Sequence, residues 1–260
     1  MKIVRFKANN GSRYGILEGE TIRALKLSPF EKGFSVNDPV FDISTYDLSA
    51  TELLAPCQPS KYVGVGLNYP EAAKELGMPL PESPLLFLRP STSVIGPGAE
   101  VVFASGQVTI IYEGELAVVI GKEAKNVPEE NALDYVLGCT CANDVTDLGK
   151  FKPNMLNLVA MKASDTFGPI GPCVDTQVDP AKARVRSWVN GALRQEGNTR
   201  ELIFGVKFLV SYLSSFMTLL PGDVISTGTP PGAAPVKPGD VVRVEVEGVG
   251  ILENRMVAAR

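Results

Sequence analysis

The chain has 260 residues, of which 45% are hydrophobic and 21% are charged. Its formal net charge is −4 and its pI is about 5.1, which argues against nucleic acid or anionic lipid as a partner. The sequence contains no histidine, so it excludes His-activated nucleophiles and lacks the commonest general base and zinc ligand.

The first part of the chain alternates between apolar and polar residues, as antiparallel strands do. Residues 26–60 carry scattered Pro, Ser and Asp with weak periodicity, which is typical of a connector. We therefore expect a small N-terminal β-domain with its connector over residues 1–56. The three strands are expected at "KIVRF" (2–6), "RYGILEG" (13–19) and "TIRAL" (21–25).

A second unit, residues 57–260, combines short apolar runs with few helical patterns. Asn190-Gly191 predicts the type I′ turn of a hairpin over residues 185–196. One long helical pattern covers residues 201–220. The excess of strands over helices predicts a β-rich α+β fold instead of alternating βαβ units. Further strands are expected at 84–88, 109–121, 135–143, 241–248 and 250–256, with a short helix at 128–136.

The sequence offers no feature that would direct it to a membrane or an oxidising compartment. No apolar run reaches the roughly 18 residues of a spanning helix, and the N-terminus lacks the apolar region of a signal peptide. Cys139 and Cys141 do not have the C-x₂-C spacing of zinc sites, so reduced core thiols are the simpler interpretation. We expect a cytoplasmic protein that acts on a small molecule, without nucleic acid or membrane partners.

The stretch "TIIYEGELAVVIG", residues 109–121, resembles a buried strand yet contains Glu113 and Glu115, which a strand points to one face. Two like charges on a half-buried face repel each other and lose hydration. Asp144 ends a neighbouring apolar stretch, where a strand would open onto a loop. A divalent cation would make three such carboxylates favourable, and oxygen-only ligands favour Mg²⁺ or Mn²⁺. From these residues alone, a solvent-facing edge strand beside a capped turn is an equally open interpretation.

Five blocks resemble, in order, those of the fumarylacetoacetate hydrolase family, from about Lys61 to the C-terminus. The first 55 residues resemble the small N-terminal β-domain of some bacterial members. The resemblance implies a mixed β-roll catalytic domain, a homodimer, and Mg²⁺ or Mn²⁺ held by Glu113, Glu115 and Asp144. The blocks are "YEGELAVVIGK", "GCTCANDVTD", "KASDTFGPIGPCV", "VNGALRQEGNT" and the segment from "LSSFMTLLPGDVISTGTPPG" to "GDVVRVEVEGVGILEN".

The same resemblance implies roles for residues outside the carboxylate group. Lys162 matches the family's active-site lysine, although a solvated loop lysine is the ordinary alternative. Thr229 matches a threonine that binds the substrate carboxylate, and Gly228 beside it is assigned to the same function. The alternative for this pair is a simple strand-end turn. Arg89 occupies the place of a basic residue near the substrate pocket.

Several positions depart from the family pattern. The usual N-Y-x-x-H-x-x-E segment keeps Tyr69, which the resemblance assigns to substrate binding, and Glu75, which it assigns to catalysis. Its histidine position is Ala72 here, so the water-activating base is missing. The Arg and Gln that hold an oxyanion in hydrolases of the family are replaced by Leu148 and Phe151.

The retained residues still suit enol chemistry, in which a metal stabilises an enolate and a lysine moves a proton. The resemblance therefore favours isomerisation of 2-hydroxyhepta-2,4-diene-1,7-dioate in aromatic-acid catabolism, with decarboxylation of 5-carboxymethyl-2-oxo-hex-3-ene-1,7-dioate as a joined activity. A second enzyme interpretation is acylpyruvate-type C–C hydrolysis or oxaloacetate decarboxylation, with Glu75 working alone. An interpretation of another class is a catalytically dead protein that binds a metal or a 2-oxo acid.

Overall fold

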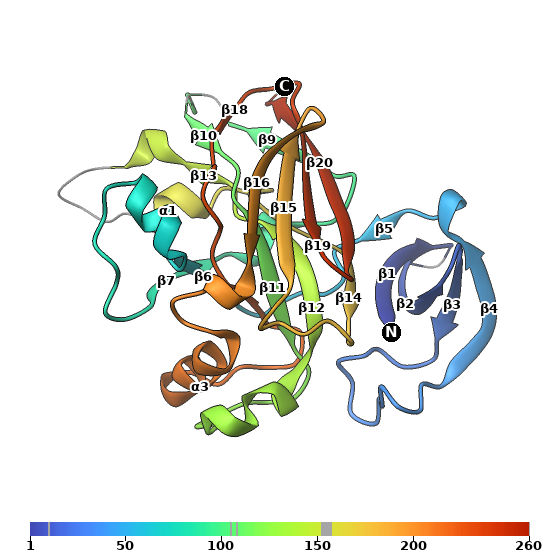
Figure 1. Cartoon of the computed structure of the whole chain (residues 1–260). Helices are drawn as coiled ribbons and strands as arrows, with labels where there is room; N and C mark the ends of the chain where they lie inside the picture. Colours follow the sequence, from blue (N-terminus) through green and yellow to red (C-terminus); the bar gives the residue numbers. More distant parts are fainter. Residues whose placement is uncertain (10, 105, 108, 152–157, 260) are drawn as a thin grey trace.

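The structure is a computed structural model that describes residues 1–9, 11–104, 106–107, 109–151 and 158–259 (Figure 1). Strands dominate it, which confirms the predicted β-rich α+β class. Within the described residues, no helix is both long enough and apolar enough to cross a membrane.

The largest sheet has 12 strands. Its order is β4-β3-β2-β1-β14-β12-β11-β17-β6-β7, with β5 paired to β1 and β8 to β14. All seven residues of β11 are buried, because alternate side chains enter two different hydrophobic clusters. The near-continuous apolar run in this strand follows from burial on both faces. The strands are β1 (Lys2–Ala8), β2 (Gly11–Glu18), β3 (Thr21–Leu25), β4 (Phe41–Asp47), β5 (Leu53–Leu54), β6 (Tyr62–Gly66), β7 (Leu85–Arg89), β8 (Val94–Ile95), β11 (Gly114–Ile120), β12 (Val136–Asn143), β14 (Gly168–Asp175) and β17 (Val224–Ser226).

A five-stranded sheet, in the order β16-β15-β19-β20-β9, packs on the middle of the large sheet. Apolar side chains of β15, β19 and β20 share one core cluster with those of β11 and β12. A three-stranded sheet has the order β13-β10-β18. In the chain, β10 directly precedes β11, β13 directly follows β12, and β18 follows β17. These strands are β9 (Glu100–Phe103), β10 (Ile110–Ile111), β13 (Thr146–Asp147), β15 (Arg184–Val189), β16 (Ala192–Asn198), β18 (Pro235–Val236), β19 (Val241–Val246) and β20 (Gly250–Ala258).

The β15–β16 hairpin turns where the sequence predicts. Asn190 and Gly191 both have positive φ angles, 50° and 82°, as a type I′ turn requires. The register shifts between Ser187 and Trp188, so a bulge interrupts the alternation of side chains along the hairpin.

The helices are shorter than the sequence pattern predicts. The pattern over residues 201–220 yields a helix of only 11 residues, α3, because Gly205 is its N-cap and the chain is extended again at Met217. The predicted helix at 128–136 is a 3₁₀ helix, η3, with Pro128 as its N-cap. The helices are α1 (Pro70–Glu75), α2 (Leu158–Lys162) and α3 (Val206–Phe216), with 3₁₀ segments η1 (Leu48–Ala50), η2 (Ser91–Ser93), η3 (Glu129–Tyr135), η4 (Leu148–Lys150) and η5 (Thr199–Glu201).

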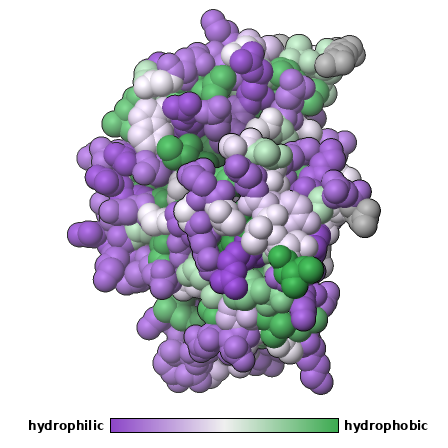
Figure 2. Space-filling view, turned by 90° about the vertical axis from the view of Figure 1, so that its right-hand side faces the viewer, coloured by the Kyte–Doolittle hydropathy of each residue, from purple (hydrophilic) through white to green (hydrophobic). Residues whose placement is uncertain are grey.

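The N-terminal strands form a group at one side of the molecule (Figure 1). The three predicted strands are present, but the predicted connector also contains β4 and β5, which its weak periodicity did not reveal. Ile3 of β1 pairs with Val174 of β14, so the group extends the large sheet. The molecule seen from this side is covered mainly by hydrophilic residues, among which hydrophobic ones form small groups (Figure 2). The domain division at residue 56 stays a prediction.

Candidate active site

The two glutamates lie at a break between two strands. The sequence predicts one strand over residues 109–121, whereas β10 joins the three-stranded sheet and β11 joins the large one. At the break, side chains replace ladder partners: Glu113 N donates to Asn143 Oδ1 at 3.2 Å, and Gly114 N donates to Gln195 Oε1 at 3.0 Å. The prediction of a single strand was therefore wrong.

Strand pairing brings the third carboxylate to the same place. Gly114 of β11 is opposite Asn143 of β12, so the residues that flank this pair, Glu113 and Asp144, become neighbours. Asp144 N donates to Glu113 O at 2.8 Å. One carboxylate oxygen from each of Glu113, Glu115 and Asp144 lies within 4.8 Å of the others. Glu115 and Asp144 are buried, and Glu113 is half-buried.

Lys162 neutralises part of this charge. It is the last residue of α2, and its Nζ donates to Glu113 Oε2 and to Asp144 Oδ2. The residue is only 6% exposed, so the alternative of a solvated loop lysine is wrong. Burial lowers the pKa of Lys162 below its usual value, although the Glu113 carboxylate acts in the opposite direction.

Arg89 is the last residue of β7, and its buried guanidinium contacts the carboxylate cluster. Its Nη2 donates to Asp144 Oδ1 and, at 2.8 Å, to Val145 O, while its Nη1 donates to Lys162 O. Desolvation lowers the pKa of this buried guanidinium to about 10. Arg89 therefore fixes both Asp144 and the backbone that carries Lys162. Its Nε has no hydrogen-bond partner within the described part of the chain, so the substrate contact predicted for Arg89 is compatible with these contacts and stays a prediction.

Glu115 is held by the segment that follows β17. Its Oε2 accepts hydrogen bonds from Ser226 Oγ and, at 2.9 Å, from Gly228 N. Burial, and secondarily the charge of Glu113, raises the pKa of Glu115 to about 7. Gly228 has a φ of 104°, and a Cβ there would lie 2.8 Å from Asn68 Cβ. Glycine is required at this position so that its N–H can approach Glu115.

The Thr229 hydroxyl makes two hydrogen bonds within the protein. Its Oγ1 donates to Gly114 O at 2.9 Å and accepts from Gln195 Nε2 at 2.7 Å. The Gln195 and Ser226 contacts were missed by sequence reasoning. Both partners are distant in the chain from the glutamates, and no local motif relates them.

Tyr69 and Glu75 lie at the two ends of α1. Tyr69 is buried, and its hydroxyl has no hydrogen-bond partner within the described part of the chain. Glu75 is exposed and its Oε2 accepts from Gly232 N at 2.9 Å. This hydrogen bond connects Glu75 to the loop after Thr229, and not to the carboxylates of Glu113, Glu115 and Asp144.

The positions that differ from the family pattern present apolar groups. Ala72 is buried in α1. Leu148 and Phe151 are 38% and 48% exposed, one at the start of η4 and the other just after it. Neither side chain can donate a hydrogen bond to an oxyanion.

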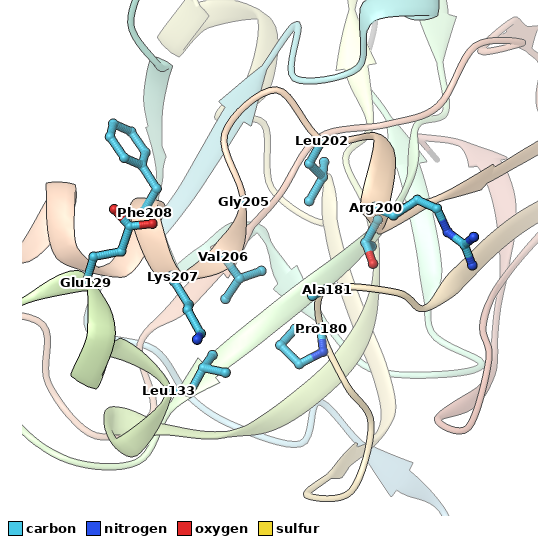
Figure 3. Close-up of a pocket in the computed structure, with 11 residues that line it drawn as sticks. Glu129, Leu133, Pro180, Ala181, Arg200, Leu202, Gly205, Val206, Lys207 and Phe208 are labelled. Carbon is cyan, nitrogen blue, oxygen red and sulfur yellow. The ribbon is translucent and has the colours of Figure 1, made fainter.

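A separate cavity of about 280 Å³ lies at the N-terminal end of α3 (Figure 3). Lys207, Glu129 and Arg200 are among its lining residues, together with apolar side chains. None of the predicted site residues lines it. The carboxylate cluster and this cavity are therefore different places.

The carboxylate cluster fits a hard divalent cation. Its donors are oxygen atoms only, which suits Mg²⁺ or Mn²⁺ better than zinc. Glu113 and Asp144 converge on a single Lys162 Nζ, so the two side chains already direct oxygens toward one common point.

The chain matches two family models, "Fumarylacetoacetate (FAA) hydrolase C-terminal" over residues 61–257 and "Rv2993c-like, N-terminal" over residues 1–56. The crystal structure of 2-hydroxyhepta-2,4-diene-1,7-dioate isomerase from Mycobacterium marinum is 37% identical, with a TM-score of 0.90 over 99% of this chain and 98% of the other. The 4-hydroxyphenylacetate degradation bifunctional isomerase/decarboxylase of Escherichia coli is 40% identical over 95% of this chain and 57% of its own length.

A structure of maleylpyruvate hydrolase from Sphingobium sp. SYK-6, in complex with manganese (II) ion and pyruvate, is also similar. It is 29% identical with a TM-score of 0.81, and the match covers all of both chains. Isomerases, decarboxylases and a manganese-bound hydrolase are thus among the proteins that this chain resembles.

Proposed function

This chain belongs to the fumarylacetoacetate hydrolase family, and from that premise we propose that it is a metal-dependent isomerase of 2-hydroxyhepta-2,4-diene-1,7-dioate or a similar 2-oxo dicarboxylate. Decarboxylation of 5-carboxymethyl-2-oxo-hex-3-ene-1,7-dioate is a joined activity in this proposal. The enzyme would act in aromatic-acid catabolism, as a homodimer in the cytoplasm.

One observation carries the proposal. The buried Lys162 ammonium contacts Glu113 and Asp144, two of three carboxylates that converge on one point. Burying a charge cluster of this kind costs desolvation free energy. Titratable groups with shifted pKa values and charged partners concentrate at functional sites.

The metal ligands in this proposal are Glu113, Glu115 and Asp144. Mg²⁺ or Mn²⁺ held there would supply a Lewis acid for the carboxylate and 2-oxo oxygens of the substrate. Arg89 and Gly228 keep Asp144 and Glu115 in place through the contacts described above.

Lys162 is the proposed proton carrier. Isomerisation of the dienol removes the proton of the 2-hydroxyl group and adds one to a carbon of the diene. Because burial lowers the pKa of Lys162, its neutral form is more accessible than that of a solvent lysine. The neutral amine can take the hydroxyl proton, and the resulting ammonium can return it to carbon.

Substrate binding is assigned to the groups around this point. The buried Tyr69 hydroxyl, without a described partner, is available to a substrate oxygen. Thr229 and Gly228 border the same carboxylates. Glu75, which accepts from Gly232 N in the loop after Thr229, is the second proposed catalytic residue beside Lys162. Arg89, which also holds Asp144, is the remaining proposed substrate-binding residue, and its Nε has no partner within the described part of the chain.

The test is an ultraviolet assay of dienol and 2-oxo dicarboxylates with and without Mg²⁺, together with a measurement of released CO₂. Loss of dienol absorbance without CO₂ indicates isomerisation, and CO₂ release indicates decarboxylation. Lys162→Met should lower turnover by about 10²–10⁴-fold, the usual contribution of a general acid or base. Its Mg²⁺ affinity should not fall, because the variant removes a competing positive charge.

The exposed Lys122 provides the matched control, since Lys122→Met makes the same change elsewhere. Near-normal turnover of the Lys162→Met variant would remove this residue from the mechanism. Absence of turnover on the whole panel, with intact metal binding, would favour the catalytically dead binding protein.

A second candidate is hydrolysis of an acylpyruvate-type C–C bond, with oxaloacetate decarboxylation as its variant. The likeness to maleylpyruvate hydrolase favours it. Against it, Ala72, Leu148 and Phe151 leave Glu75 as the only residue of the expected hydrolytic set. We expect little hydrolysis, and Ala72→His should raise it. Hydrolysis by the unmodified protein at an ordinary rate of roughly 1–10³ s⁻¹ would reverse this ranking.

A further inference from the structure

Gln195 breaks the hydrophobic pattern of its strand. On β16 this polar residue is 1% exposed, whereas Leu193, two positions earlier, is 50% exposed. The strand thus exposes its leucine and buries its amide, beside the bulge opposite Ser187 and Trp188. Local rules of this kind are commonly broken at functional sites, where another gain compensates.

All four hydrogen-bonding positions of the Gln195 amide are used. Oε1 accepts from Gly114 N at 3.0 Å and from Ser187 Oγ at 2.8 Å. Nε2 donates to Thr229 Oγ1 and to Pro230 O, both at 2.7 Å. A glutamine amide offers two donors and two main acceptor positions, so this group is saturated and its orientation is fixed.

The contacts close a ring around the residue between the two glutamates. Gly114 N is held by Gln195, Gln195 is held by Thr229 Oγ1, and Thr229 Oγ1 donates to Gly114 O at 2.9 Å. A Cβ on Gly114 would lie 3.1 Å from Ser187 Cβ and 3.2 Å from Gln195 Oε1, so glycine permits this close approach.

From this ring we infer that Gln195 is a positioning residue that fixes the Glu113-Gly114-Glu115 segment against the Thr229-Pro230 loop. It acts at both ends of the site, because one end carries two proposed metal ligands and the other carries a proposed substrate group. Gln195 also fixes the position of Thr229 Oγ1, because its Nε2 donates to this oxygen at 2.7 Å. The inference rests on the proposed function for its consequences in binding.

Gln195→Met removes the amide and keeps the length of the side chain. Gln195 holds the backbone between two proposed ligands and not a ligand carboxylate itself, so Mn²⁺ should bind more weakly, by up to the 10–100-fold typical when an outer partner of a ligand is lost. In hydrogen exchange of the metal-free protein, the Gly114 amide, which Gln195 holds, should lose protection. Calorimetry with Mn²⁺ alone and exchange by mass spectrometry measure the two effects.

Asn254→Leu is the matched control. Asn254 is also a buried amide of the five-stranded sheet, and it donates to Gly96 O at 2.9 Å and to Ala99 O at 2.8 Å, away from the site. A merely structural role for Gln195 predicts that both variants lose stability and neither loses Mn²⁺ affinity. Wild-type Mn²⁺ affinity and unchanged exchange in the Gln195→Met variant would overturn the inference.

A double-mutant cycle tests whether Gln195 acts through Thr229. Pyruvate affinity at saturating Mn²⁺ should fall in Gln195→Met and in Thr229→Val, and the double variant should lose no more than the larger single loss. Fully additive losses would contradict action through Thr229.

Gln195→Glu keeps the test decisive if the methionine variant fails to fold. It retains the shape and the acceptor for Gly114 N, and removes both donors to the 229–230 segment. Pyruvate should then bind more weakly because the 229–230 segment loses both donors, and unchanged pyruvate affinity would overturn the inference. If the wild-type protein bound no Mn²⁺, the proposed function would fail, and exchange in the metal-free protein would still decide the role of Gln195.

Discussion

Glu115 is the residue at which burial and charge oppose each other most directly. It is buried, it lies near the Glu113 carboxylate, and its contacts to Ser226 and Gly228 offset only part of the cost of its charge. A divalent cation would turn this unfavourable position into a favourable one.

The first prediction concerns the charge of this residue. Glu115→Gln removes one of three negative charges from the proposed metal site and keeps the size of the side chain. Mg²⁺ affinity should therefore fall by more than the 10–100-fold typical of an outer partner, with the protein still folded. Calorimetry measures it, and Glu123→Gln, at an exposed position, is the control with the same change in charge. Unchanged Mg²⁺ affinity of the Glu115→Gln variant would refute the ligand assignment.

A second prediction follows from the raised pKa of Glu115, about 7 in the folded metal-free protein against an ordinary glutamate pKa of 4.5. Between these values the folded state binds more protons than the unfolded state. Stability should therefore decrease as pH rises through this window and level off above pH 7, by an amount on the order of 3 kcal/mol.

Urea unfolding of chelator-treated protein at several pH values measures this effect. Glu115→Gln provides the reference, because it cannot titrate and should lack this component of the pH dependence. Identical pH profiles of the two proteins would show that Glu115 does not titrate in this range.

At the scale of elements, the hairpin turn isolates a backbone effect from packing. Gly191 has a φ of 82°, and a Cβ there would meet no atom within 4 Å. Gly191→Ala should destabilise the protein by roughly 1–2 kcal/mol, the cost of the left-handed conformation for a residue with a Cβ. Thermal unfolding measures it, and Mn²⁺ affinity should not change. An unchanged melting temperature would mean that the turn relaxes without cost.

Elements with strong local patterns were predictable from the sequence. The three N-terminal strands, the Asn190-Gly191 turn and the exit of β12 at Asp144 all follow from alternation, turn chemistry or a polar residue after an apolar run. The ends of α3 were not predictable from periodicity, since the apolar pattern continues past both the N-cap Gly205 and Met217, where the backbone is extended again. Strand β4 was missed because pairing with β3 overrides its weak pattern.

The candidate site divides in the same way. The spacing of Glu113 and Glu115 indicated two of the three carboxylates, and the resemblance added roles for Lys162 and Thr229. The break in the strand between Ile111 and Gly114 depends on which sheet each half joins, a long-range property that local alternation does not encode. The contacts of Gln195 likewise join segments far apart in the sequence.

At the scale of the whole molecule, the site joins segments that are distant in the chain. Glu113 and Glu115 flank the start of β11, Asp144 follows β12, Lys162 ends α2, and Ser226 of β17 holds Glu115. These elements meet only in the folded protein, so an ion bound there should stabilise the fold as a whole. The N-terminal strands belong to the same sheet, so they should share in this stabilisation.

The last prediction is therefore that Mn²⁺ raises the melting temperature. An ion that binds only the folded state at about 100 times its Kd adds about 2.7 kcal/mol. For a chain of this size that corresponds to a shift of roughly 5–10 °C. Scanning calorimetry over a Mn²⁺ titration measures the shift, with Glu123→Gln expected to follow the wild type and Glu115→Gln to show little response. An equal shift in the Glu115→Gln variant would mean that the ion stabilises the protein by binding elsewhere, and the assignment of the carboxylate cluster as the metal site would be wrong.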